Sequence, residues 1–280
     1  MATLAEYQQS QRIAALVFGR FKVGKTFGAA TWPRPNFLMF DRDGIATLTN
    51  PDFIAKHGWK GDLLFEEFRD KNKDKWGAIK THNALDDACR YFDKWMTPTY
   101  RDKFDTWVVD SGTSLTEACR NKAIYLMSQA GMGVKSNTLE IGHKTGMIAP
   151  KVQDYGAERS MLEQFIQMLL DTDKHVLFLC HEKEITSDSG SVEAIVPALT
   201  GQSVDAVSVK FSEVWNVARV KQAALWIPVV KTSQTMTLKV GSRLGIPDGT
   251  PFDYSSITKA LATSREQAKV SSPSAPTTKG

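Results

Sequence analysis

The residues best suited to chemistry form one short run, GRFKVGKT, at positions 19–26. It has the spacing G-x-x-x-x-G-K-[ST], in which glycines let backbone N–H groups close around phosphate oxygens. Lys25 would reach the β- and γ-phosphates, and the Thr26 hydroxyl would bind Mg²⁺. We therefore predict a site for a nucleoside triphosphate and Mg²⁺, formed by Gly19, Arg20, Phe21, Lys22, Val23, Gly24, Lys25, Thr26 and Phe27.

A carboxylate near the metal is the second requirement, and Asp110 ends the apolar run WVVD. An aspartate at the end of a buried strand can hold the water shell of Mg²⁺, so Thr26 and Asp110 form the predicted metal site. The next residue is Ser111, where many P-loop ATPases keep a catalytic base. The base must therefore come from elsewhere in the chain.

The candidates for that base lie in FDRDG, which offers Asp41 and Asp43 at the end of an expected strand. A carboxylate there could orient and deprotonate the attacking water. Of the two we prefer Asp43, with a solvated Asp-Gly turn as the alternative. His181 follows another apolar run, where it could sense the γ-phosphate by hydrogen bonding or merely cap its strand.

The elements that must position these residues alternate between apolar runs and amphipathic stretches, the pattern of an α/β protein. Strands are expected at 12–18, 36–41, 63–68, 106–111 and 175–181, and shorter ones at 214–220, 225–231 and 235–239. Helices are expected from Gly24 to before Pro33 and at 83–96, 114–130 and 155–172, with a hairpin or mobile loop at 187–203. We predict a mostly parallel central sheet with a C-terminal antiparallel β extension in one domain, residues 1–263, and a disordered polar tail at 264–280.

Composition narrows the class of protein. The 280 residues carry 35 Lys+Arg and 31 Asp+Glu, and this small positive excess permits nucleic acid as a partner without arguing for it. The three cysteines, Cys89, Cys119 and Cys180, are widely spaced, which argues against a disulfide framework or a Cys-rich zinc site. Because no apolar run suits a signal peptide or a membrane span, we expect a soluble cytoplasmic protein with no membrane partner.

Taken in order, four segments resemble the RecA-like core of P-loop ATPases: GRFKVGKT, FDRDG, VVDSGTSL and LFLCHEK. More narrowly, the sequence resembles phage-encoded RecA-core ATPases of the single-strand annealing class, the Sak-type recombinases. The segments that carry this resemblance are KVGKT (22–26), DYGAERSMLEQFIQMLL (154–170), HEK (181–183), PALTGQS (197–203) and SRLGIPDGTPFDY (242–254). The resemblance covers about residues 12–262. The first motif is specific to P-loop proteins, and the others are specific mainly by their order.

The resemblance implies an ATPase that acts in phage recombination, in the cytoplasm of the host cell. Lys25 and Thr26 would bind ATP and Mg²⁺, and Asp110 would be the Walker B acid. Asp43 would match the family's catalytic acid, although that acid is usually glutamate, one methylene longer. His181 would match the sensor of the γ-phosphate.

The resemblance also implies partners. Arg243, or Lys239, would match the basic finger that RecA-like subunits insert into a neighbour's site, which implies an oligomer, either a ring or a filament. The ligand would be single-stranded DNA, annealed or exchanged between strands, with a single-strand-binding protein as a further partner. In the basic, glycine-rich loop at 129–153 the expected DNA contacts are Lys135, Lys144 and Lys151. The loop at 183–210 is net acidic and a weaker candidate.

Two other functions stay open on the sequence alone. A nucleotide-dependent switch or adaptor would bind ATP without DNA and act through protein contacts. A small-molecule kinase would need an Arg-rich lid, for which Arg120 and Arg159 are too sparse. An ordinary surface loop is the alternative interpretation of 129–153.

Overall fold

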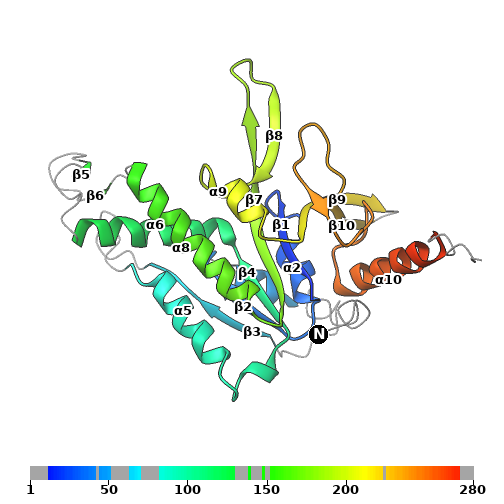
Figure 1. The fold of residues 1–280 in the computed structure, drawn as a ribbon, viewed down its shortest axis with the longest axis horizontal. Helices are drawn as coiled ribbons and strands as arrows, with labels where there is room; N and C mark the ends of the chain where they lie inside the picture. Colours follow the sequence, from blue (N-terminus) through cyan, green and yellow to red (C-terminus); the bar gives the residue numbers. More distant parts are fainter. Residues whose placement is uncertain are drawn as a thin grey trace, which may run out of the picture.

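The computed structural model describes residues 12–41, 44–51, 63–70, 82–129, 138–139, 147–148, 152–222 and 225–271. Within these ranges a nine-stranded sheet forms the centre of the molecule, and its main path has the order β10-β9-β1-β7-β4-β2-β3 (Figure 1). The strands are β1 (Ala14–Gly19), β2 (Pro35–Met39), β3 (Leu64–Glu67), β4 (Thr106–Asp110), β7 (His175–Thr186), β8 (Val192–Pro197), β9 (Glu213–Gln222), β10 (Leu225–Lys231) and β11 (Gly241–Ser242). A separate small sheet pairs β5 (Thr138–Leu139) with β6 (Met147–Ile148).

The sheet is mostly parallel, as predicted. The strands β3, β2, β4, β7, β1 and β9 run in one direction, while β8, β10 and β11 pair antiparallel with their neighbours. The central strands read as continuous apolar runs because both faces of the sheet are covered. The α/β fold class with a C-terminal antiparallel extension is thereby confirmed.

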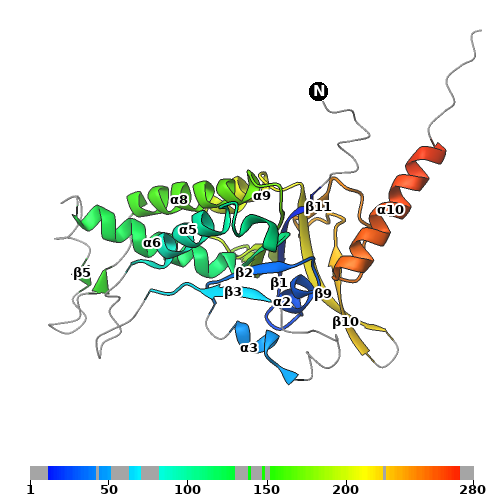
Figure 2. The same ribbon diagram turned by 90° about the horizontal axis from the view of Figure 1, so that it is seen from below.

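Helices cover both faces of the sheet (Figure 2). On one face lie α5 (Ala84–Trp95), α6 (Gly112–Gln129) and α8 (Val152–Leu170), whose apolar residues share a core with Phe18, Val109 and Phe178. The other face holds α2 (Lys25–Ala30), α3 (Ile45–Leu48) and the first turns of α10 (Tyr254–Ser271). A short helix, α9 (Ser203–Ser208), and a 3₁₀ turn, Arg101–Lys103, complete the described elements.

Two sequence predictions differ from the structure. The segment 235–239 is not a strand, although Leu238 forms a single bridge with Ile195. Leu238 and Val240 are buried while Lys239 between them is exposed. The segment therefore has the alternating burial of a strand without a row of backbone hydrogen bonds to a neighbouring strand. The boundary expected at residue 263, between the domain and a disordered tail, falls inside α10. This helix continues through 264–271, because Arg, Glu, Gln, Ala and Lys favour helix. Residues 272–280 lie outside the described part of the chain.

The parallel strands bring the predicted chemistry to one edge. In register, Gly19 of β1 lies opposite His181 of β7, and Asp110 of β4 lies opposite Met39 of β2. The carboxyl ends of β1, β4 and β2 are therefore adjacent to His181 of β7, and side chains at these positions meet at one edge of the sheet.

Candidate nucleotide-binding site

The loop at 19–26 joins β1 to α2 and depends on glycine at two points. Gly24 has a φ of 106°, in the left-handed region where an L side chain is strained. A Cβ atom at Gly19 would lie 2.4 Å from the Val217 carbonyl oxygen of β9. The loop therefore follows a tight path against β9 that side chains at these positions would block.

Lys25 is held inside this loop. Its Nζ donates hydrogen bonds to the carbonyl oxygens of Gly19 at 2.8 Å and Arg20 at 2.9 Å. The side chain is buried, and desolvation lowers the pKa of the ammonium group, opposed by the charge of Asp110. A buried ammonium group held only by carbonyl oxygens would gain a stronger, charge-assisted partner in a phosphate oxygen.

Thr26 and Asp110 contact each other directly. The threonine Oγ1 donates to Asp110 Oδ2 at 2.7 Å, from the first turn of α2 to the end of β4. Burial raises the pKa of Asp110 to about 6, against the lowering effect of this hydrogen bond. A hydroxyl and a carboxylate are the hard oxygen ligands that Mg²⁺ prefers, with water and phosphate completing the shell. Among the described residues no cluster of three or more His, Cys, Asp or Glu side chains could hold a metal alone.

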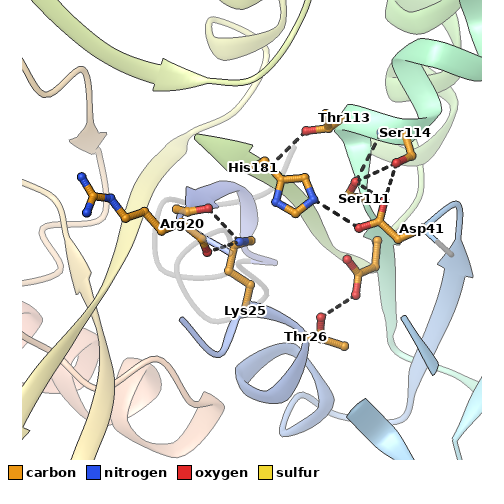
Figure 3. A network of polar contacts seen from close by, with 10 residues as sticks. Arg20, Lys25, Thr26, Asp41, Ser111, Thr113, Ser114 and His181 are labelled. Carbon is orange, nitrogen blue, oxygen red and sulfur yellow. Dashed lines mark hydrogen bonds and ion pairs between the residues drawn. The ribbon is translucent and has the colours of Figure 1, made fainter. Parts of the chain in front are cut away.

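Asp41, just past β2, is the centre of a second polar network (Figure 3). Its Oδ1 accepts hydrogen bonds from Ser111 Oγ, at 2.7 Å, and from Ser114 Oγ, while Oδ2 lies 3.4 Å from His181 Nε2. Burial raises the pKa of Asp41, but the hydrogen bonds from His181, Ser114 and Ser111 outweigh it and lower the pKa to about 2. The carboxylate is therefore ionised and fixed in orientation.

His181 lies between this network and the phosphate loop. Its backbone N–H donates to Thr113 Oγ1 at 3.0 Å, and its ring centroid is 6.1 Å from that of Phe21. About a third of the side chain is exposed. His181 thus lies at the carboxyl edge of the parallel strands, with Asp41 on one side and the loop on the other.

Arg20 ties the phosphate loop to β7. Its guanidinium forms ion pairs with Glu182 at 3.0 Å and with Glu184 at 3.1 Å, and Glu182 also accepts from Asn216 Nδ2 at 3.0 Å. Three strands, β1, β7 and β9, are connected in this way around the start of the loop. The arginine itself is mostly exposed, so these pairs position the loop more than they stabilise the fold.

The structure brings some predicted residues together and leaves others apart. Lys25, Thr26, Asp110 and His181 converge, and the carboxylate that joins them is Asp41, which we ranked below Asp43. Asp43 lies outside the described residues, and so do the expected DNA contacts Lys135, Lys144 and Lys151. Ser111, Thr113 and Ser114 were not predicted as site residues. Their signal in the sequence is three hydroxyl residues close after the expected Walker B strand, a pattern that is also common at the start of a helix.

Arg243 lies near the amino-terminal end of β9, at the edge of the sheet opposite the phosphate loop. Its backbone N–H donates to Ser212, just before β9, five residues from the level of the phosphate loop at Val217. At about 3.3 Å per residue this is roughly 16 Å along the strand. Lys239 instead bonds through its backbone to Ile195 of the β7–β8 hairpin, which projects from the phosphate-loop edge. Within one chain, Arg243 is therefore not part of the site.

A phosphate loop between β1 and α2, with a paired threonine and Walker B aspartate beneath it, defines an α/β P-loop NTPase with a RecA-like core. The model of a family described as AAA domain matches residues 11–244, so the chain belongs to this family of ATPases. No curated protein matches the sequence. In the part of the chain that the structure describes, no helix combines the length and apolarity needed to cross a bilayer.

Two solved structures match the chain at low sequence identity. A KaiC-like protein from Pyrococcus horikoshii has 11% identity and a TM-score of 0.39, over 80% of this chain and 79% of its own. The flagellar accessory protein FlaH from Methanocaldococcus jannaschii has 8% identity and a TM-score of 0.33, over 82% and 86%.

Proposed function

We propose that the protein is a Mg²⁺-dependent ATPase that binds single-stranded DNA as an oligomer and promotes annealing or strand exchange in phage recombination. One observation carries the ATPase part: the lysine, the threonine–aspartate pair and the Asp41 network meet at the carboxyl edge of four parallel strands. The donor set suits ATP and Mg²⁺, because it offers an ammonium group, hard oxygen ligands and a backbone loop.

Each residue has a distinct role in this proposal. Lys25 exchanges the carbonyl oxygens of Gly19 and Arg20 for phosphate oxygens and stabilises the charge that develops on them. Thr26 and Asp110 hold Mg²⁺, which when bound neutralises phosphate charge. Lys25 and Thr26 lie in the first turn of α2 and Asp110 ends β4, so these groups are positioned by regular elements before the reaction begins.

Asp41 orients the attacking water. With a pKa of about 2 it is a weak proton acceptor, but phosphoryl transfer relies on positioning more than on base strength. Ser111 and Ser114 donate to one carboxylate oxygen, and the other lies beside His181. His181 in turn contacts Phe21 in the phosphate loop, which suits a side chain that responds to the γ-phosphate.

The DNA part of the proposal is supported by the resemblance to single-strand annealing ATPases. Lys135, Lys144 and Lys151 would bind the DNA backbone, and Arg243 would reach the site of the neighbouring subunit. Its position far from the phosphate loop of its own chain agrees with action on a neighbour. A single-strand-binding protein would be a natural partner at the DNA.

The test is steady-state ATP turnover with and without single-stranded DNA, at several salt concentrations. We expect DNA to stimulate turnover, and we expect added salt to weaken the effect because phosphate contacts release counterions. A turnover indifferent to DNA at low salt, together with no DNA binding, would contradict the DNA part and favour a nucleotide-dependent switch that acts through protein contacts.

A further inference from the structure

The β9–β10 hairpin carries an exposed tryptophan beside the phosphate loop. Trp226 is 61% exposed, which is unusual for so large an apolar side chain. Strand β9 starts parallel to β1 and continues past its end, since Phe18 pairs with Asn216 and β9 runs on to Gln222. The outer half of the hairpin therefore projects from the edge where β1 turns into the loop, next to α2 (Figure 2).

The register of the hairpin shows which face Trp226 occupies. Trp226 pairs with Lys221, Pro228 with Arg219 and Val230 with Val217, and paired residues and every second residue share a face. Val217 and Val230 pack in the core beneath α2. A Cβ atom on Gly24 would lie 3.3 Å from Pro228. Trp226 is thus on the face that contacts the phosphate loop, two residues closer to the tip of the hairpin than Pro228.

Charge on this face favours a phosphate-bearing ligand. Arg219 and Lys221 stand opposite Pro228 and Trp226, and both are exposed. Between Val214 and Lys231 the sequence contains no Asp or Glu, so this part of the hairpin presents two cations and an aromatic ring on one face with no carboxylate among them.

The layout of the site directs a nucleotide toward this face. The metal pair and the Asp41 network lie on the β7, β4 and β2 side of β1, so the terminal phosphate belongs on that side. The nucleoside must then extend to the other side, where β9 and β10 follow. Strand β10 is two strands from β1, which is about 10 Å across the sheet.

We infer that Trp226 forms the stacking platform for the base of the bound nucleotide, with Arg219 and Lys221 beside its ribose and α-phosphate. This inference rests on the proposed binding of ATP at residues 19–26 and adds the base subsite to it. An exposed indole is well suited to the task, because base–aromatic stacking requires a flat, accessible ring.

Calorimetric titration with ATP and with inorganic tripolyphosphate tests the subsite. Trp226→Ala is expected to weaken ATP binding by at least about fivefold, the low end of the loss for a stacked base. The affinity of Trp226→Ala for tripolyphosphate, which has no base, should equal that of the wild type. Trp226→Phe should retain most of the ATP affinity because it keeps a stacking ring.

Leu225→Ala is the matched control. Leu225 is also 61% exposed but pairs with Gln222 on the opposite face of the hairpin, so this variant should bind ATP like the wild type. Unchanged ATP affinity in Trp226→Ala would overturn the inference, and so would loss of single-stranded DNA binding with ATP binding intact. A wild-type protein that binds neither ATP nor tripolyphosphate would overturn the underlying proposal as well, so the two failures are distinguishable.

Discussion

At the scale of single residues, Asp41 illustrates how a carboxylate of low basicity can serve in a phosphoryl-transfer site. Two serine hydroxyls and His181 stabilise its anion against the cost of burial. The side chain is therefore ionised well below neutral pH and has one direction for an incoming hydrogen bond. That arrangement positions water without requiring the carboxylate to keep the proton.

Asp41→Asn should lower ATP turnover by about a hundredfold or more, in the range lost when a positioned acid or base is removed. ATP affinity should change little, because the amide keeps the volume of the side chain and the phosphate loop is untouched. Turnover and nucleotide titration on the same preparation separate the two effects. Asp43→Asn is the matched variant, and a larger loss there than in Asp41→Asn would contradict this assignment.

The residues of the site were predictable to different degrees. Residues 19–26 could be recognised because phosphate binding by a backbone loop needs glycines and a lysine at fixed spacing. Asp41 and Asp43 could not be separated, since both follow the same strand and residues two apart share a face. Ser111, Thr113 and Ser114 are common residues at a helix start, and only the packing of β4 against β7 and β2 reveals their partners.

At the scale of elements, the position of α2 depends on one close approach. A Cβ atom at Gly28 would lie 2.2 Å from the Phe252 carbonyl oxygen and 2.3 Å from its ring. Phe252 is buried and also contacts Trp215 of β9. The segment before α10 thereby fixes the helix that carries Lys25 and Thr26.

Gly28→Ala should destabilise the fold by about 1–3 kcal/mol, the usual cost of overpacking a core. Gly156→Ala in α8 is the control, because a Cβ there meets nothing within 4 Å and alanine should stabilise the helix by about 0.5–1 kcal/mol. Urea denaturation of both variants measures the difference. Equal stabilities would contradict the packing account.

His175, at the start of β7, should make stability depend on pH. Its Nδ1 accepts a hydrogen bond from the Ile13 backbone N–H at 3.0 Å. Desolvation lowers the pKa of the imidazole below 6.5, Asp105 raises it and Arg12 lowers it further. The folded state thus binds fewer protons than the unfolded state just below that value. The stability that His175 contributes is present above pH 6.5 and is lost as pH falls through the folded-state pKa.

Denaturation of the wild type and of His175→Gln from about pH 5 to 8 checks this dependence. Glutamine can accept the same hydrogen bond through its amide oxygen but does not titrate. The wild type should lose more free energy of unfolding on acidification than the variant. Identical slopes would mean that another group causes the pH dependence.

At the scale of the whole molecule, strand count was easier to predict than strand order. The five strands expected before residue 182 are all present, because buried parallel strands read as apolar runs between helical patterns. Their order could not be derived locally. Strand β7 pairs with β1, although Val176 and its partner Ala14 lie 162 residues apart in the sequence, and it also pairs with β4 on its other side. Only tertiary contacts reveal these neighbours.

The oligomer proposed above makes Arg243 a residue of the neighbouring site. Arg243→Ala should then be inactive as an ATPase by itself, with its own phosphate loop intact. Mixing it with Lys25→Ala should restore part of the turnover, because some interfaces would pair a complete loop with an intact arginine. If mixing two inactive variants restores no turnover under conditions where subunits exchange, the arginine does not act on a neighbour.

ATP turnover by the wild type and by Lys25→Ala, with Mg²⁺ and single-stranded DNA present, tests the central claim most directly. Removal of the ammonium group from the phosphate loop should lower turnover by at least about a hundredfold, as loss of one preorganised charge-stabilising group does. Far-ultraviolet circular dichroism should show the fold retained. Turnover by Lys25→Ala equal to that of the wild type would contradict the assignment of residues 19–26 as the catalytic nucleotide site.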